Sequence, residues 1–167
     1  HSCVLIDFFG SGGSTGSMTT FGYLEAGDVV ASVDFYREKF PERKLVLYGI
    51  SMGGASILRA CAELGVRPDG LISGSTFPHF RETVAKRFEL MGLPSFPAAD
   101  LLIFWGGSDL GIRPHEHNPI DYAGEIDLPV LLLTGEHDHR VPVERVGKMA
   151  ERFPNLLAYR VFDAGHR

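Results

Sequence analysis

Short apolar runs recur along the chain, and each is followed by a polar or glycine-rich segment. The runs cover residues 3–9, 44–48, 69–75, 128–134 and 156–162. Most are continuous rather than alternating, which is the pattern of strands that are buried on both faces of a sheet. We therefore expect about five strands in a mostly parallel sheet.

Between these runs, apolar residues recur at helical spacing. Val29, Val33, Tyr36 and Phe40 make one such stripe, and Pro41 ends it. The same reading places helices over residues 23–40, 55–64 and 143–153. Alternating strands and helices predict an α/β fold with helices on both faces of the sheet. Functional sites of such sheets form in the loops that follow the carboxyl ends of the strands.

Residues 76–123 lack a simple pattern and are too long for a plain connection. The whole chain, residues 1–167, has the length of a single domain. We expect residues 76–123 to form a cap-like insertion within it. Aromatic residues and one methionine of this stretch either line a pocket for an acyl group or side chain, or serve only in packing: Phe77, Phe88, Met91, Phe96 and Trp105.

Composition narrows the function classes. The chain is 44% hydrophobic and 22% charged, as in ordinary soluble domains, and no apolar run approaches the roughly 20 residues of a membrane span. The net charge of −5 and the scattered basic residues argue against binding to nucleic acid. Cys3 and Cys61 cannot form a disulfide framework and are expected to be buried free thiols.

The pattern Gly-x-Ser-x-Gly occurs twice, around Ser14 and around Ser51. A nucleophilic serine of this pattern needs a strand before it and a helix directly after it. Ser51 follows Leu45-Val46-Leu47-Tyr48 and precedes a run of small residues, whereas Ser14 is followed by more loop. Ser51 is therefore the predicted nucleophile, and the N–H of Met52 at the helix start is a predicted oxyanion donor.

A serine nucleophile needs a general base, which is usually a histidine oriented by a carboxylate. His166 lies just past the last predicted strand and is the preferred base; His79 is a distant second. Asp138 lies in the polar turn after residues 128–134 and is the preferred carboxylate. Glu136 competes on the same turn, and Asp163 serves as a loop-capping residue in our interpretation.

The order Ser, Asp, His, each after a different strand, is that of α/β-hydrolases. Together, Gly-Ile-Ser-Met-Gly-Gly-Ala, Gly-Glu-His-Asp-His-Arg-Val-Pro and the Ala-Gly-His ending resemble the α/β-hydrolase superfamily, closest to its serine aminopeptidase-like branch of esterases and acylglycerol lipases. The resemblance spans nearly the whole chain. It implies a cap between the sixth and seventh strands, and a small-molecule ester, thioester or amide substrate with no cofactor.

The same resemblance matches residues 3–9 to the fourth strand of that fold. It implies that three strands, a second oxyanion donor and a closing helix have no counterpart here. Residues 3–9 are then expected to be unpaired or forced against residues 44–48, with His166 on a poorly anchored end. Both ends of the chain look cut, so a cytoplasmic location is only weakly indicated.

Other readings are less favoured. His115-Glu116-His117 and His137-Asp138-His139 lack the i, i+4 spacing of helical zinc ligands, and we expect no metal. The leading hypothesis is a serine hydrolase that works through Ser51, His166 and Asp138. The alternatives are a non-catalytic binding domain or inactive fragment of the same fold, and a haloperoxidase- or lyase-like activity.

Overall fold

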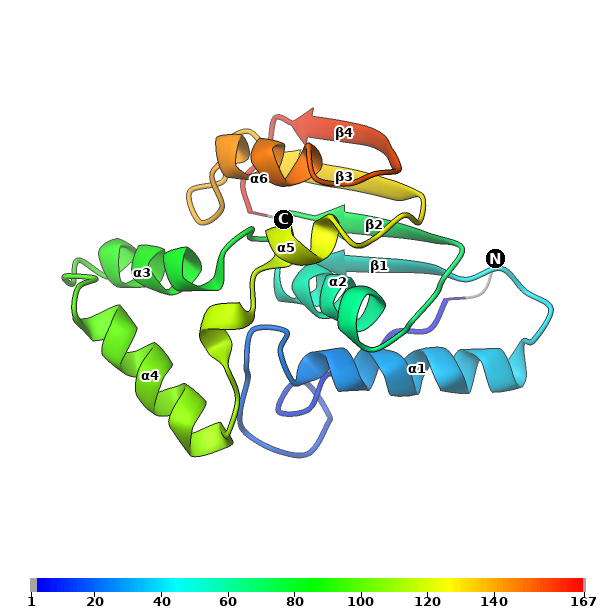
Figure 1. Ribbon diagram of the computed structural model, residues 1–167, viewed down its shortest axis with the longest axis horizontal. Coiled ribbons are helices and arrows are strands. Elements are labelled where there is room, and N and C mark those ends of the chain that lie inside the picture. Colours follow the sequence, from blue (N-terminus) through cyan, green and yellow to red (C-terminus); the bar gives the residue numbers. More distant parts are fainter. Residues whose placement is uncertain (1–2, 167) are drawn as a thin grey trace.

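A computed structural model describes residues 3–166 of the chain. In this part four strands form one parallel sheet in the order β1-β2-β3-β4 (Figure 1). The strands are β1 (Val46–Ile50), β2 (Gly70–Gly74), β3 (Val130–Gly135) and β4 (Leu156–Phe162). The helices are α1 (Glu25–Lys39), α2 (Met52–Glu63), α3 (Phe80–Leu90), α4 (Ala98–Leu110), α5 (Pro119–Ala123) and α6 (Val143–Ala150), with a short 3₁₀ turn, η1 (Pro114–Glu116). The predicted α/β class and the parallel sheet are confirmed.

Helices of the described part cover one face of the sheet. Gly49 of β1 packs against α2 and is paired with Ser73, whose partner in β3 is Leu132. Leu132 is fully buried and is paired with Tyr159, whose hydroxyl donates to the backbone oxygen of Val143 at the start of α6. By this register, α2 and α6 lie on the same face.

The opposite face differs from the expectation of helices on both sides. Tyr48, which points the other way from Gly49, remains 60% exposed, and Val46 and Ile50 beside it are exposed as well. On the same face, Ile72 of β2 and Leu131 and Leu133 of β3 are half-buried. The continuous apolar runs had indicated full burial on both faces, and in residues 3–166 this face is exposed at β1 and half-buried at these positions of β2 and β3.

The predicted strand over residues 3–9 is not formed. Residues 3–8 are irregular, and Leu5 is 91% exposed. The segment borders an apolar groove of about 520 Å³ whose other wall is β1 and α1. A strand exists only when a neighbouring strand accepts and donates its backbone hydrogen bonds, and here β1 has β2 as its only strand partner in the sheet. The run is therefore unpaired, which was one of the two expected outcomes.

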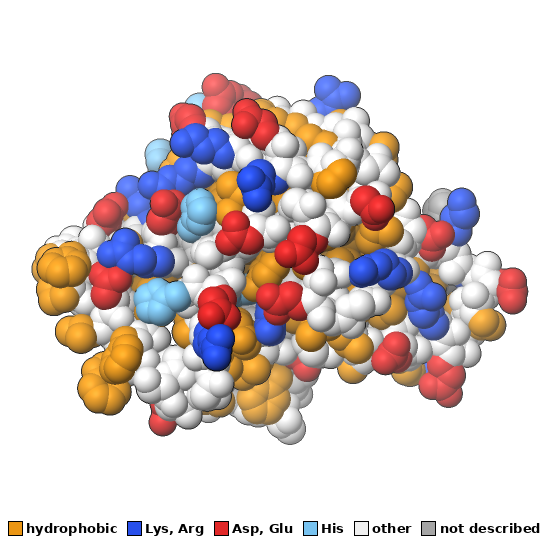
Figure 2. All heavy atoms as spheres, in the orientation of Figure 1, with side chains coloured by type: hydrophobic (Ala, Val, Ile, Leu, Met, Phe, Trp, Pro, Cys, Tyr) orange, Lys and Arg blue, Asp and Glu red, His pale blue; other side chains and the backbone are white. Residues whose placement is uncertain are grey.

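Residues 76–123 contain α3, α4, η1 and α5. The α3–α4 hairpin projects from the end of the sheet (Figure 1), and Arg81 of α3 forms a bidentate ion pair with Asp100 of α4. Its tip exposes large apolar side chains, which gather on the left of the space-filling view (Figure 2). These include Leu90, Met91, Leu93, Phe96, Leu101, Leu102, Phe104 and Trp105. That this region acts as a cap remains a prediction.

His117 ties this insertion to the body of the protein. It is 1% exposed, and its Nε2–H donates to the backbone oxygen of Phe21 while Nδ1 accepts from the Tyr122 hydroxyl. Rings of Tyr23, Phe77 and Phe80 surround it. Because burial disfavours the charged imidazolium, the pKa of His117 is lowered from 6.5 to about 4.

This lowered pKa predicts a loss of stability in mild acid. Between pH 6.5 and 4 the unfolded chain binds a proton at His117 that the folded chain does not, so stability falls as pH falls. From pH 7 to pH 5 we expect the free energy of unfolding to drop by about 2 kcal/mol from this group. Urea titrations at both pH values measure it. The pKa of the neighbouring Glu25 is lowered, so that carboxylate stays ionised over this window.

The matched variants are H117Q and H115Q, since His115 lies two residues away without being buried. In H117Q the pH-dependent loss should shrink by about 2 kcal/mol, whatever the absolute stability. In H115Q it should persist. Equal pH dependence in wild type and H117Q would contradict the assignment.

The two cysteines differ in their exposure to solvent. Cys61 is buried as expected, and burial raises its pKa to about 12. Cys3 is exposed, contrary to expectation, because its segment does not enter the sheet. None of the helices within residues 3–166 combines the length and apolar character of a membrane span.

Candidate active site

Ser51 lies between β1 and α2 in a sharp turn. Its backbone φ of 52° and ψ of −113° fall in a region that non-glycine residues rarely adopt. The turn is held by the N–H of Ser51, which donates to the backbone oxygen of Gly74 at 2.7 Å. Helix α2 starts at the next residue. Strand, strained serine and helix therefore follow one another as the sequence predicted.

Close packing explains why small residues surround this serine. A Cβ on Gly49 would lie 2.5 Å from the carbonyl carbon of Gly53, and one on Gly54 would lie 1.9 Å from Oγ1 of Thr76. Gly53, the second glycine of the motif, has no such restriction: a Cβ there would only touch Phe8 at 4.0 Å. The tight approach of β1 and α2 thus depends on Gly49, and the approach of α2 to Thr76 after β2 depends on Gly54.

Three side chains from three loops meet beyond the carboxyl ends of the strands. Nε2 of His166 lies 3.1 Å from Oγ of Ser51, and Nδ1 of His166 lies 2.7 Å from Oδ2 of Asp138. An ionised carboxylate can only accept, so Nδ1 carries the proton and Nε2 is free to accept from the serine hydroxyl. This tautomer is the one that a general base for Ser51 requires.

Asp138 is held firmly before it meets the histidine. Its side chain is fully buried, and Oδ1 accepts from the backbone N–H groups of Arg140 and Val141, both at 2.9 Å. The other oxygen, Oδ2, is thereby left to His166. Because the backbone of its own turn fixes the carboxylate, the position of Asp138 does not depend on His166, and Asp138 can orient the imidazole.

The loop that carries His166 is bound to the Asp138 turn. The N–H of His137 donates to the oxygen of Ala164 at 2.9 Å, and a Cβ on Gly135 would lie 2.3 Å from the oxygen of Gly165. His166 is 15% exposed. The expected poor anchoring of His166 is therefore not observed. Gly135, the last residue of β3, is not among the predicted site residues, although a glycine directly after the predicted strand over residues 128–134 was an available signal.

Met52 is the first residue of α2. At that position a backbone N–H has no acceptor within the helix, and the helix dipole favours negative charge. Its sulfur lies 3.0 Å from Oγ1 of Thr19, whose hydroxyl also reaches Oε1 of Glu25 at 2.9 Å. The predicted oxyanion donor is thus adjacent to Ser51, and its role remains a prediction.

The competing candidates occupy other positions. Ser14 donates to the backbone oxygen of Asp7 in the 10–20 loop, away from any helix start. His79 is the residue before α3, and Glu136 is exposed. Asp163 pairs with His137 at 3.0 Å. Within residues 3–166 no three metal-binding side chains gather in one place.

The five residues proposed as a pocket do not line the cavity at Ser51. Phe77 is buried in the core and lines only the neighbouring cavity between α3 and the loop after Asp138. Phe88 packs against the core. Met91, Phe96 and Trp105 are exposed on the α3–α4 hairpin. The structure does not bring them to the serine, because the face of α3 that points toward Ser51 carries other residues.

That face of α3 was missed in the sequence. The cavity at Ser51 and His166 is lined by Thr83, Lys86, Arg87, Leu90, Arg140 and Val141. Four of these lie at positions 83, 86, 87 and 90, which is the i, i+3, i+4, i+7 spacing of one helix face. The spacing is visible in the sequence, but these residues are mostly polar, whereas the predicted pocket consisted of aromatic residues and one methionine.

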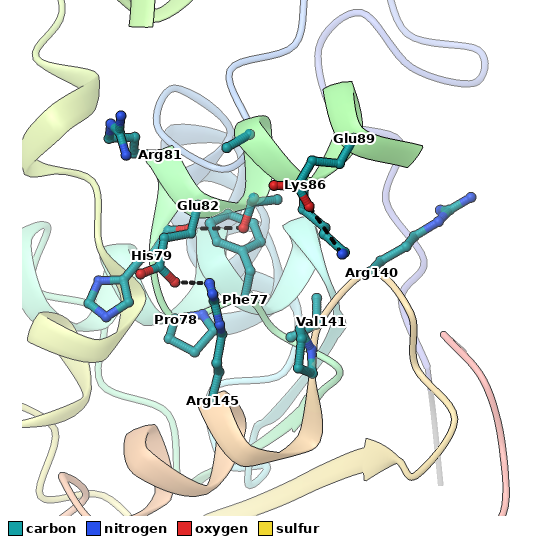
Figure 3. A pocket seen from close by; sticks show the side chains of 13 residues that line it. Phe77, Pro78, His79, Arg81, Glu82, Lys86, Glu89, Arg140, Val141 and Arg145 are labelled. Carbon is teal, nitrogen blue, oxygen red and sulfur yellow. Dashed lines mark hydrogen bonds and ion pairs between the residues drawn. The ribbon is translucent and has the colours of Figure 1, made fainter. Parts of the chain in front are cut away.

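A second cavity, of about 170 Å³, adjoins the first and shares Thr83, Lys86, Arg140 and Val141 with it. In Figure 3, Arg145 reaches from α6 to Glu82 of α3 across this cavity, and Lys86 lies beside Glu89. The space beside Ser51 therefore continues between α3 and the loop that follows Asp138.

Comparisons with known proteins agree on the fold. Residues 1–98 match a protein-family model described as alpha/beta hydrolase fold. The uncharacterized protein YqkD of Bacillus subtilis is 28% identical over 160 residues, which cover 92% of this chain and 52% of that protein. The chain spans about half the length of the curated relatives it matches.

Solved structures give the same result. The esterase Pf2001 of Pyrococcus furiosus superposes with a TM-score of 0.73 at 28% identity, covering 96% of this chain and 60% of that chain. A thermophilic esterase from Thermogutta terrifontis superposes with a TM-score of 0.60 at 25% identity, covering 96% of this chain and 71% of that one. Both neighbours are esterases.

Proposed function

The chain belongs to the alpha/beta hydrolase fold family, and we propose that it acts as a serine hydrolase on a carboxylic ester, thioester or amide. The observation that carries the proposal is the unbroken set of contacts from Ser51 Oγ through both nitrogens of His166 to Asp138. The similarity of the chain to solved esterase structures favours an ester among the three substrate classes.

The reaction follows from the protonation states in this set. Ser51 Oγ attacks the substrate carbonyl while Nε2 of His166 takes the hydroxyl proton, and Asp138 stabilises the imidazolium that forms. The N–H of Met52 donates to the oxyanion of the tetrahedral intermediate. His166 then gives the proton to the leaving group, which departs and leaves an acyl group on Ser51. Water, activated by the same histidine, releases the carboxylic acid.

A fluorophosphonate probe tests this proposal directly. An activated serine attacks the phosphorus and expels fluoride, so we expect a covalent adduct on the tryptic peptide of residues 45–59, with fragment ions that place it on Ser51 rather than Ser56. Ser14 lies in the second Gly-x-Ser-x-Gly of the same chain and serves as an internal control, since it should stay unmodified.

The experiment is run on the 167-residue chain and on the protein that its gene encodes. Adduct on Ser51 supports the proposal. A protein without any adduct in either form would support the rival function, a binding domain without catalysis. Adduct on Ser14 or Ser56 instead would contradict the assignment of the nucleophile.

A further inference from the structure

Two arginines from different elements lie at the candidate nucleophile. Arg87 comes from α3, and Arg140 comes from the turn that holds Asp138. Both line the cavity that contains Ser51 and His166. They are therefore placed where a group attached near the scissile bond of a substrate would lie.

The charges of these two arginines are not balanced within the site. The other cations nearby are paired: Lys86 with Glu89 at 3.2 Å, and Arg145 with Glu82. Among residues 3–166, no ion pair with a carboxylate involves Arg87 or Arg140. The carboxylates of α3 are thus already engaged, and neither of the two arginines that line the cavity at Ser51 forms an ion pair with a carboxylate of residues 3–166.

The positive charges of Arg87 and Arg140 also repel each other. Partial burial, and secondarily the positive charge of Arg140, lower the pKa of Arg87. The guanidinium of Arg87 is held 4.9 Å from the centroid of the Phe21 ring, a cation–π contact that fixes its position. Two like charges held near one another are a favourable site for an anion, because an anion between them relieves their repulsion.

We propose that the substrate carries a negatively charged oxyacid group, a carboxylate or a phosphate, which binds between Arg87 and Arg140 beside Ser51. The proposal builds on the proposed hydrolase function and narrows its substrate class. A guanidinium presents donors in a planar fork that matches the oxygens of such a group, so both arginines can bind it at once. Neutral esters lack this group and receive only the contacts made by Leu90, Thr83 and Val141.

Matched pairs of esters test the proposal. In the first pair the charge lies on the acyl side: mono-p-nitrophenyl glutarate and its neutral methyl ester. In the second it lies on the leaving group: 3-acetoxybenzoate and its methyl ester. We expect kcat/KM of wild type to favour the anionic member of at least one pair by about tenfold or more, since a hydrogen bond to a charged group contributes that much. Added salt should reduce this preference.

The variants R87Q and R140Q locate the effect. Each should lower the ratio of anionic to neutral kcat/KM several-fold, and the double variant should bring it close to one. R43Q is the matched control, because Arg43 also lies over an aromatic ring, that of Phe40 at 5.2 Å, but precedes the amino end of β1, whereas Ser51 follows its carboxyl end. Its ratio should equal that of wild type. Circular dichroism and the melting temperature verify that all variants are folded.

The ester assays and the fluorophosphonate assay together distinguish failure of the proposed anion site from failure of the proposed hydrolase function. Hydrolysis of neutral and anionic esters at equal kcat/KM in both pairs, or a preference that survives the double variant, overturns the anion site and leaves the hydrolase standing. 3-Acetoxyphenyl phosphate, which carries a phosphate where 3-acetoxybenzoate carries its carboxylate, distinguishes the two oxyacids by the ratio of their kcat/KM values. Absence of hydrolysis of every ester, together with absence of fluorophosphonate adduct, overturns both proposals.

Discussion

Alanine in place of Ser51 is expected to lower kcat for a p-nitrophenyl ester roughly 10⁶-fold, because the acyl-enzyme can no longer form. The substitution removes only Oγ, whose contact with Nε2 of His166 is 3.1 Å. Alanine tolerates the backbone angles of this position as well or as poorly as serine does, so the fold should survive. Initial rates at saturating ester, with a correction for spontaneous hydrolysis, provide the measurement.

Ser14 gives the matched control for this substitution. S14A removes a hydroxyl from the same five-residue pattern, at a position whose partner is the backbone oxygen of Asp7. The rate of S14A should lie within a factor of two or so of wild type. A rate for S51A above a tenth of wild type would show that another group performs the attack.

The second large effect is expected from D138N, which should lower kcat about 10⁴-fold. An asparagine amide that donates where Oδ2 now accepts would force the proton of His166 onto Nε2, where it faces Ser51. The base would then be unable to take the serine proton. Both N–H groups of Arg140 and Val141 can still donate to the remaining carbonyl oxygen, so the turn is retained.

D163N is the counterpart for this test. Asp163 follows the carboxyl end of β4 and also contacts a histidine, His137 at 3.0 Å. Its ion pair is with His137 and not with His166. Its kcat should stay near wild type. Equal losses in D138N and D163N would mean that general charge near the site, rather than the orientation of His166, controls the rate.

Sequence patterns predicted the sheet well where a strand has a partner. The run over residues 156–162 is a strand with those bounds, and the runs at 69–75 and 128–134 differ from β2 and β3 by one or two residues. The run over residues 3–9 is equally apolar and is no strand. Hydrophobicity reports the tendency to leave water, but hydrogen bonding to a neighbour decides whether a strand forms.

The candidate site also has a part that the sequence predicts and a part that it does not. Ser51, Asp138 and His166 were found because each follows a strand, and the carboxyl ends of parallel strands meet at one edge of the sheet. The lining of the cavity was missed, because it depends on how α3 is rotated toward Ser51. No local pattern encodes that rotation, which is set by contacts with residues distant in the chain, such as Arg145 of α6.

The contact between His166 and Ser51 joins residues that are 115 positions apart in the chain. A contact of such long range costs loop-closure entropy and forms late in folding. At synthesis rates of about 5–20 residues per second, roughly 6–23 s separate the emergence of the two residues from the ribosome. Throughout that interval Ser51 lacks the imidazole that the proposed mechanism requires as its base. In that mechanism the serine is activated only after β4 and the loop that carries His166 have docked.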